Sequence, residues 1–286
     1  EWDGIPMVDN KWLLTDVLRK EWGFKGIVVS DLGAIKMSLE NHQVAKDTTD
    51  AVAQALNAGL NMQFYDFTHK NYAKAIDSAL HNHTLSPAKL DSAIADVLRV
   101  KFLLGLFDNP YIDTTLFARV KNSAAHQQIA LKAAQESICL LKNDDHVLPL
   151  KNIHRIAVIG PSAKSNCLGG YSNTGDTAVS LLAGLRQRAS ADIRVNYAEG
   201  ISKTGKDTAL DNAIHLVRNS DVAIVALGEN PQEVGEGKDR AELNLDPAQL
   251  QLIKAIQQTG KPVVAVLVNG RALTINWVAA NVPAIM

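Results

Sequence analysis

Two stretches of this sequence carry carboxylates where a folded chain can use them for chemistry. In the first, a β-branched run at 27–29 ends at Ser30 and Asp31, and Gly33 follows. A short apolar run predicts a strand buried on both faces, and α/β folds place their reactive groups at the carboxyl ends of such strands. Asp31 is therefore a candidate catalytic group. The alternative is that Ser30 and Asp31 only cap the next helix or hold a turn.

The second stretch, residues 228–243, follows another predicted strand and contains five acidic residues in sixteen positions. It is longer than the roughly 2–6 residues usual for a connection from strand to helix. Acidic clusters on loops are usually solvated surface, but such a surface needs no flanking glycines. Lys238 and Arg240 favour an ionised carboxylate nearby. A general acid in this loop therefore needs burial or a neighbouring negative charge to keep its proton.

A second long loop, residues 160–175, is also rich in glycine and follows a predicted strand. It resembles a phosphate-binding loop in composition only, because it has neither the G-x-G-x-x-G pattern nor the GK[ST] ending. The sequence favours a loop ordered around Gly169 and Gly170 that lies over a neighbouring domain.

Composition narrows the classes of function. The 286 residues are 47% hydrophobic and 21% charged, an ordinary globular composition with room for one large or two average domains. With 29 basic and 30 acidic residues, there is no electrostatic case for nucleic acid or an anionic membrane. No run approaches the roughly 18 apolar residues of a membrane span. Cys139 and Cys167 make neither a disulfide framework nor a cluster of metal ligands.

The elements that must position these groups follow an α/β order. Asn10 is placed to cap a helix that begins near Lys11 and ends at Gly23. Helical patterns are expected at 48–58, at about 70–80 and from Pro87, with a second strand at 60–64. These are two strand–helix units at the usual spacing.

Beyond Gly105 the periodicity is lost until about Ala125, which predicts a linker. Strand and helix patterns then alternate cleanly. Strands are expected at 156–159, 193–197, 222–227 and 263–268, with helices near 178–188, 208–218 and 247–258. This alternation predicts a doubly wound, mostly parallel sheet.

Residues 23–31, GFKGIVVSD, resemble the nucleophile segment of glycoside hydrolase family 3, the β-glucosidase and β-xylosidase family. The resemblance implies that Asp31 is the nucleophile that attacks the anomeric carbon. Leu32 stands where that family often has a tryptophan. Leu32 and Tyr65 are the candidate substrate contacts, although Tyr65 either stacks on a sugar or simply covers the rim of a barrel.

Residues 235–240, GEGKDR, resemble the acid/base motif of the same family and point to Glu236. Glu233 and Glu229 are the alternatives. The triplet NGR at 269–271 also resembles a turn of the family, and we expect Arg271 to be structural.

The resemblance implies a (β/α)8 barrel followed by an αβα sandwich, but two strand–helix units cannot close a barrel of eight. We therefore expect an α/β chain in which residues 1–105 are the last two strand–helix units of a (β/α)8 barrel whose first part is absent. Residues 106–125 are expected to be a linker, and residues 126–286 a doubly wound αβα sandwich domain that is cut short at its C-terminus.

The implied function is a retaining β-glycoside hydrolase that releases non-reducing terminal sugars by double displacement, with β-glucosidase first and β-xylosidase second. Its substrate is an oligosaccharide or β-glycoside, and one carboxyl group comes from each domain. No metal or organic cofactor is required, and the 286 residues alone are expected to be inactive. The alternatives are a non-catalytic sugar-binding or structural relative and a β-N-acetylglucosaminidase. A periplasmic or secreted location is suggested by the resemblance alone.

Overall fold

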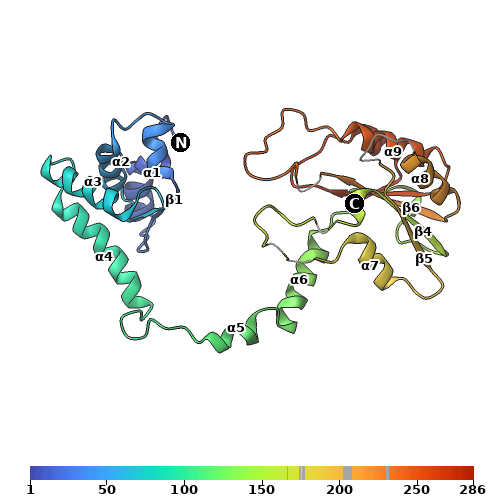
Figure 1. The fold of residues 1–286 in the computed structure, drawn as a ribbon, viewed down its shortest axis with the longest axis horizontal. Helices are drawn as coiled ribbons and strands as arrows, with labels where there is room; N and C mark the ends of the chain where they lie inside the picture. The colour runs from blue at the N-terminus through green and yellow to red at the C-terminus, as the bar shows by residue number, and fades with distance from the viewer. Residues whose placement is uncertain (166, 174, 176–177, 202–207, 230–231) are drawn as a thin grey trace. The chain divides into compact units, whose positions relative to one another are not determined.

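The computed structural model describes residues 1–286 except 166, 174, 176–177, 202–207 and 230–231 (Figure 1). Contacts divide the chain into two compact units, Glu1–Lys121 and Asn122–Met286. The division falls inside the predicted linker. This stretch is not free of regular structure, because α5 spans Thr114–Val120 and the side chain of Asp113 caps it. A helix of seven residues is too short to show a clear period in the sequence.

The first unit contains both predicted strands in the predicted order. Its elements are η1 (Met7–Asp9), η2 (Trp12–Glu21), β1 (Val29–Leu32), α1 (Ala34–Glu40), α2 (Thr48–Ala58), β2 (Met62–Phe64), α3 (His69–His81) and α4 (Pro87–Leu103). The strands pair in parallel, with Val29 opposite Met62 and Leu32 opposite Phe64. Asn10 caps the helical stretch that begins at Lys11 and continues as η2, as expected, because its Oδ1 accepts a hydrogen bond from Leu13 N at 3.0 Å.

Two features of this unit differ from the sequence prediction. The short helix α1 was not predicted; it begins after Gly33, whose φ of 74° turns the chain. The strand before it is not buried on both faces, because Ser30 is buried whereas Val29 is 43% exposed and Leu32 is 59% exposed. Successive strand residues point to opposite faces, so Val29 faces away from the side on which Ser30 is packed. The pairing of β1 with β2 is irregular between Val29 and Leu32, so this alternation does not extend to Leu32.

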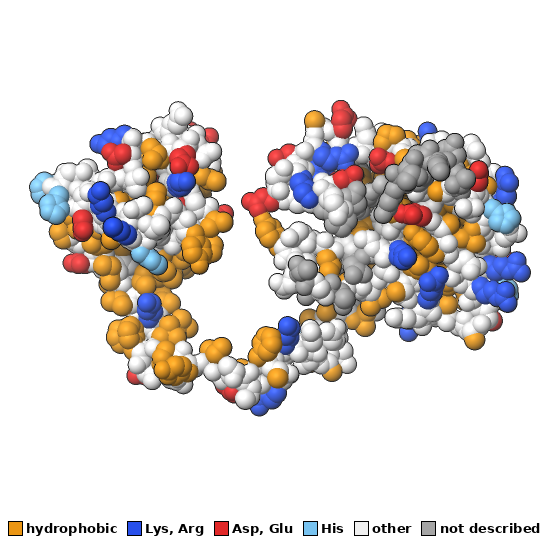
Figure 2. Space-filling model, viewed as in Figure 1, with side chains coloured by type: hydrophobic (Ala, Val, Ile, Leu, Met, Phe, Trp, Pro, Cys, Tyr) orange, Lys and Arg blue, Asp and Glu red, His pale blue; other side chains and the backbone are white. Residues whose placement is uncertain are grey.

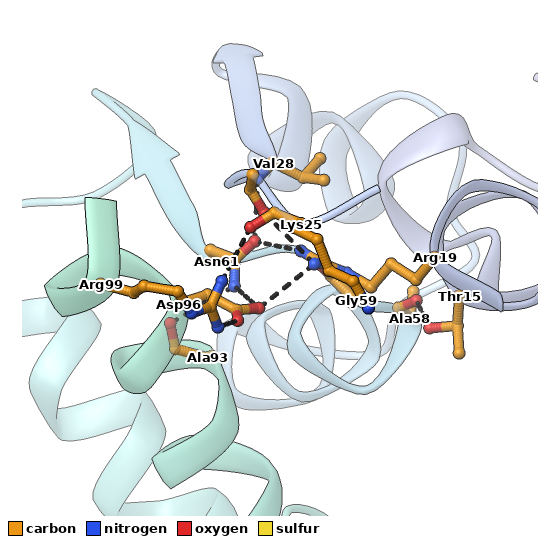
Figure 3. A network of polar contacts seen from close by, with 11 residues as sticks. Thr15, Arg19, Lys25, Val28, Ala58, Gly59, Asn61, Ala93, Asp96 and Arg99 are labelled. Carbon is orange, nitrogen blue, oxygen red and sulfur yellow. Dashed lines mark hydrogen bonds and ion pairs between the residues drawn. The ribbon is translucent and has the colours of Figure 1, made fainter. Parts of the chain in front are cut away.

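A polar network holds the start of β2 against its neighbours, with Asn61 at its centre (Figure 3). The Oδ1 atom of Asn61 accepts hydrogen bonds from Arg19 Nη2 at 2.6 Å and from Val28 N at 2.8 Å. Its Nδ2 atom donates to Asp96 Oδ2 on α4 at 3.1 Å. Arg19 also pairs with Asp96 Oδ2 at 3.2 Å. The network therefore ties η2, α4 and the approach to β1 to one side chain.

The second unit contains a six-stranded sheet in the order β3-β8-β7-β6-β4-β5, parallel except for the β3–β8 pair. Its strands are β3 (Lys142–Asn143), β4 (Arg155–Ile159), β5 (Arg194–Ala198), β6 (Val222–Gly228), β7 (Val263–Val268) and β8 (Ala284–Ile285). Its helices are α6 (Ala124–Ser137), η3 (Asp144–His146), η4 (Pro161–Ala163), α7 (Leu181–Arg188), α8 (Thr208–Arg218), α9 (Pro247–Gln257) and α10 (Asn276–Asn281). The predicted doubly wound, mostly parallel sheet is confirmed.

Helices cover both faces of this sheet, with α8 and α9 on one face and α7 on the other (Figure 1). Strand residues alternate between the two layers: Ile159 and Val225 pack in the core with α8 and α9, whereas Val158 and Ile224 pack in the core with α7. All seven residues of β6 are buried. This burial explains why β6 is a continuous apolar run in the sequence.

Candidate active site

Asp31 lies within β1, one residue before the strand ends, rather than just beyond it. Its side chain is exposed, and its Oδ1 atom accepts a hydrogen bond from Leu32 N at 2.7 Å. The first turn of α1 is bonded by a different carboxylate, Asp66. Asp31 is therefore an exposed carboxylate at the carboxyl end of a parallel strand and does not cap the next helix.

Asp66, which the sequence analysis missed, fixes the strand end that carries Asp31. It is buried, and its Oδ1 atom accepts from Ile35 N at 2.7 Å and from Lys36 N at 3.1 Å. Its Oδ2 atom accepts from Ser30 Oγ at 2.8 Å, and this hydroxyl in turn accepts from Phe64 N at 2.7 Å. The signal was present in the sequence, because Asp66 follows the second strand just as Asp31 ends the first.

Tyr72 lies close enough to Asp66 for the carboxylate to disfavour ionisation of the tyrosine hydroxyl. Burial, with a smaller contribution from the charge of Asp66, raises the pKa of Tyr72 to about 12. Its hydroxyl oxygen is buried and has no hydrogen-bond partner among the described residues. Tyr72 therefore stays neutral at any ordinary pH.

Both candidate substrate contacts of the first unit are exposed at the ends of neighbouring strands. Leu32 pairs in register with Phe64, and Tyr65 follows directly. Tyr65 is 81% exposed and has a positive φ of 55°, and its ring lies tilted by 51° against that of Phe64, with 5.0 Å between the ring centroids. A cavity of about 670 Å³ lies beside it, lined by residues of 61–72 that include Phe67 and Tyr72. Contact of Leu32 or Tyr65 with a sugar stays a prediction.

In the second unit, Glu229 directly follows β6 and is buried. Its Oε1 atom pairs with Arg271 Nε at 2.9 Å and with Arg240 Nη1 at 3.3 Å. Its Oε2 atom is buried without a hydrogen-bond partner among the described residues. Two guanidinium groups therefore contact one oxygen of the buried Glu229 side chain. The loop that follows includes residues 230–231, which lie outside the described residues.

Glu236 and Glu233 are both exposed on the loop after β6. The hydroxyl of Tyr171 donates a hydrogen bond to Glu236 Oε2. Tyr171 belongs to the 160–175 loop, of which residues 166 and 174 lie outside the described residues. Two loops that the sequence analysis treated separately therefore meet at Glu236. The contacts of Arg271 with this loop fit the structural role expected for it.

A crevice of about 800 Å³ opens in this unit at the carboxyl ends of β4, β5 and β6. It lies where the strand order reverses, between β4 and β6, the usual place for a ligand in a doubly wound fold. Glu229 and Gln232 line it, as do Ser162 and Lys164 of the 160–175 loop.

Comparison with known families accounts for most of the chain. The family described as "Glycosyl hydrolase family 3 N terminal domain" matches residues 1–100, and "Glycosyl hydrolase family 3 C-terminal domain" matches residues 138–286. The chain belongs to glycoside hydrolase family 3. The predicted family is confirmed, and Asp31 and Glu236 lie in the N-terminal and C-terminal matches respectively.

Relatives within glycoside hydrolase family 3 include a "Beta-xylosidase" of Formosa agariphila, 37% identical over 100% of this chain and 42% of the relative. A "Periplasmic beta-glucosidase" of Salmonella typhimurium is 35% identical over 96% of this chain and 39% of the relative. Among solved structures, the β-glucosidase of Listeria innocua in complex with glucose has a TM-score of 0.88 at 33% identity, covering 99% of this chain and 39% of that chain. The chain thus spans about two fifths of the length of these relatives.

Two other features are absent from the part of the chain that the structure describes. No group of three or more His, Cys, Asp or Glu side chains there is arranged to hold a metal ion. In the same residues, no helix is both long and apolar enough to cross a membrane.

Proposed function

We propose that this chain is part of a retaining β-glycoside hydrolase that releases non-reducing terminal sugars. Membership of glycoside hydrolase family 3 supports the proposal, as do the relatives named β-glucosidase and β-xylosidase. β-Glucosidase is the first activity to test and β-xylosidase the second. A periplasmic or secreted location belongs to the same proposal and has the support of one relative's name.

The observation that carries the proposal is an exposed carboxylate in each of the two family motifs, at Asp31 and Glu236. In the proposed reaction, a carboxylate oxygen of Asp31 attacks the anomeric carbon as the glycosidic C–O bond breaks. Glu236 gives its proton to the leaving oxygen, and a glycosyl ester of Asp31 forms. Glu236 then takes a proton from water, which attacks the same carbon and restores Asp31. Retaining glycosidases need such groups about 5–5.5 Å apart, and the scheme uses no metal or cofactor.

Glu236 suits the acid/base role better than Glu229. An acid/base group must gain and lose a proton in each cycle, whereas Glu229 is buried and paired with two arginines. Protonation of Glu229 would leave the guanidinium groups of Arg240 and Arg271 without their anionic partner. Glu233 is exposed like Glu236 and stays the alternative to test.

The test uses the whole protein and two substrates that differ in leaving group. Replacing Asp31 by Ala should abolish turnover of every glycoside. Replacing Glu236 by Ala should lower kcat/KM, which reports the first step, on the order of 10²–10⁴-fold on methyl β-glucoside and much less on dinitrophenyl β-glucoside, whose leaving group needs no proton. Azide should then release a β-glycosyl azide from the Glu236 variant.

The outcomes separate the alternatives. A Glu236→Ala variant with wild-type rates on methyl glycosides would exclude Glu236 as the acid, and Glu233→Ala would be measured next. Wild-type protein that binds sugars but hydrolyses neither β-glucosides nor β-xylosides would favour a non-catalytic relative. Preferential hydrolysis of β-N-acetylglucosaminides in the same assay would favour the β-N-acetylglucosaminidase alternative.

A further inference from the structure

The loop that carries Glu236 is held at both ends by residues 268–274, which are the last residue of β7 and the segment that follows it. At its start, Glu229 N donates to Val268 O at 3.0 Å. At its end, Thr274 N donates to Leu243 O at 2.8 Å, and Asn244 and Thr274 form an isolated parallel bridge. Residues 229–243, which we term the acid/base loop, therefore begin and end on one neighbouring stretch of chain.

Between these ends, one side chain reaches three points of the acid/base loop. Arg271 Nε pairs with Glu229 Oε1 at 2.9 Å. Arg271 Nη2 donates to Glu233 O at 2.8 Å and to Lys238 O at 3.1 Å. Its backbone neighbour Gly270 lies against Val234, since a Cβ at Gly270 would be 3.7 Å from that side chain. The guanidinium thus bonds backbone on both sides of Glu236.

The loop needs such a support because of the residues beside Glu236. Gly235 and Gly237 have positive φ values of 136° and 71°. Glycine has more accessible backbone conformations than any other residue, so a glycine on each side gives Glu236 little local restraint. Within the described part of the loop, Lys238 N donates to Gly235 O at 3.3 Å, a long bond for a turn.

We propose that Arg271 is a positioning residue that fixes the acid/base loop so that Glu236 is presented in one geometry. Glu229 is the buried partner that orients the guanidinium. The inference rests on the proposed role of Glu236 and adds the residues that place it. Arginine is suited to this because its planar group carries five donors in a fixed fork, whereas a lysine ammonium is a single point charge.

The kinetic test compares Arg271→Met with wild type in the whole protein, on methyl and dinitrophenyl β-glucosides. A loop that no longer presents Glu236 should lose about 10²-fold in kcat/KM on the methyl glycoside. The loss on the dinitrophenyl glycoside should be much smaller, because that leaving group does not need the acid. Arg271→Lys should remain impaired, since one ammonium cannot replace the fork. Arg188→Met, an exposed arginine at the end of α7, is the matched control.

A second measurement does not depend on activity. Amide hydrogen exchange of peptides covering 229–243 should become faster in Arg271→Met and stay unchanged in Arg188→Met. If the Arg271→Met protein does not fold, Glu229→Gln replaces it, because the amide keeps the shape but leaves two arginines without a carboxylate. The same direction of change is expected.

These results distinguish the two proposals. If Glu236→Ala keeps its activity on methyl glycosides, the proposed function fails, and exchange still tests the support of the loop. If Glu236→Ala behaves as an acid variant but Arg271→Met slows both substrates equally, or leaves exchange in the loop unchanged, the positioning role of Arg271 is wrong.

Discussion

The carboxylate of Asp66 illustrates how one residue sets the geometry of another. It accepts three hydrogen bonds inside the first unit, from Ser30 Oγ, Ile35 N and Lys36 N. Each donor would be left without its partner if the carboxylate were removed. Because an unsatisfied buried polar group costs about 1–3 kcal/mol, the structure depends strongly on this side chain.

The first prediction is that Asp66→Ala lowers the free energy of unfolding by about 3 kcal/mol, measured by urea denaturation of the whole protein. Asp77→Ala, at an exposed position on α3, should change it by less than about 0.5 kcal/mol. Equal stability of the two variants would show that Asp66 does not hold the strand end.

The second prediction concerns Asn61, at the centre of the polar network of the first unit. In Asn61→Asp, an oxygen would replace the nitrogen that donates to Asp96 Oδ2 at 3.1 Å. Two carboxylates would then face each other, which raises the pKa of one of them. We expect a loss on the order of 1–3 kcal/mol at pH 7 that shrinks below about pH 5, where a proton again bridges the pair.

Urea denaturation at pH 7 and pH 4.5 checks this prediction for Asn61→Asp. Asn71→Asp, the same change at an exposed position on α3, serves as the control and should show no such loss. A pH-independent loss in Asn61→Asp would contradict the proposed repulsion with Asp96.

At the scale of the elements, α4 is joined to the rest of the first unit through Asp96. Burial alone would raise the pKa of Asp96, but hydrogen bonds from Arg99 and Asn61 and the charge of Arg19 together lower it from its ordinary value of 3.8. Because the folded state binds this proton more weakly than the unfolded state, the contribution is present above pH 3.8. It is lost as the pH falls through the lowered value.

The third prediction follows from this sign. The wild-type protein should lose stability more steeply than Asp96→Asn between about pH 5 and pH 2, measured as the urea midpoint at each pH. Parallel curves for the two proteins would mean that Asp96 does not contribute through its charge.

At the ends of the central strands of the second unit, glycines allow the carbonyl oxygen of a neighbouring strand to approach closely, because they carry no Cβ. A Cβ on Gly228, at the end of β6, would lie 1.9 Å from Val268 O of β7, and φ there is 132°. Backbone atoms on both sides are fixed by the parallel ladder, so the clash cannot be relieved by a rotamer change.

The fourth prediction is that Gly228→Ala destabilises the second unit by several kcal/mol, beyond the roughly 1 kcal/mol that a positive φ alone costs an alanine. Gly260→Ala supplies the comparison, because Gly260 also has a positive φ of 74° but a Cβ there meets nothing within 4 Å. Thermal unfolding of the two variants measures the difference. Similar melting temperatures of the two variants would show that the contact between Val268 O and Gly228 does not exclude a side chain at residue 228.

At the scale of the whole molecule, the first unit leaves much apolar surface uncovered. Figure 2 shows hydrophobic side chains gathered over the end of α4 and the turn that follows. Among them Phe102 is 65% exposed, Leu103 79% and Phe107 54%. The two-stranded sheet of this unit is also far from the eight strands of a closed barrel.

The fifth prediction is that the 286-residue chain, purified by itself, hydrolyses aryl β-glucosides no faster than its Asp31→Ala variant. It should also bind a hydrophobic dye such as ANS, because its exposed apolar side chains form a patch of the kind that other protein surface usually covers. Turnover near that of the whole protein would refute the expectation that the remaining barrel strands are needed.

The sequence by itself determined the order of elements, the doubly wound sheet and the family, because these depend on local patterns. Alternation of apolar and polar residues marks strands and helices within a few residues, and the motifs around Asp31 and Glu236 are contiguous. Three features could not be predicted from the sequence: the boundaries of β1, the short helix α1 and the helix within the predicted linker. Each spans only a few residues, which is too short for a clear periodic pattern.

Only the tertiary structure decided how the candidate groups are held. Asp66 bonds residues 30–36, Tyr171 reaches Glu236 and Arg271 spans Glu229, Glu233 and Lys238. These contacts join residues that are about 30 to 65 positions apart in sequence. No local propensity encodes them, because they form only after the strands that carry them have been packed side by side.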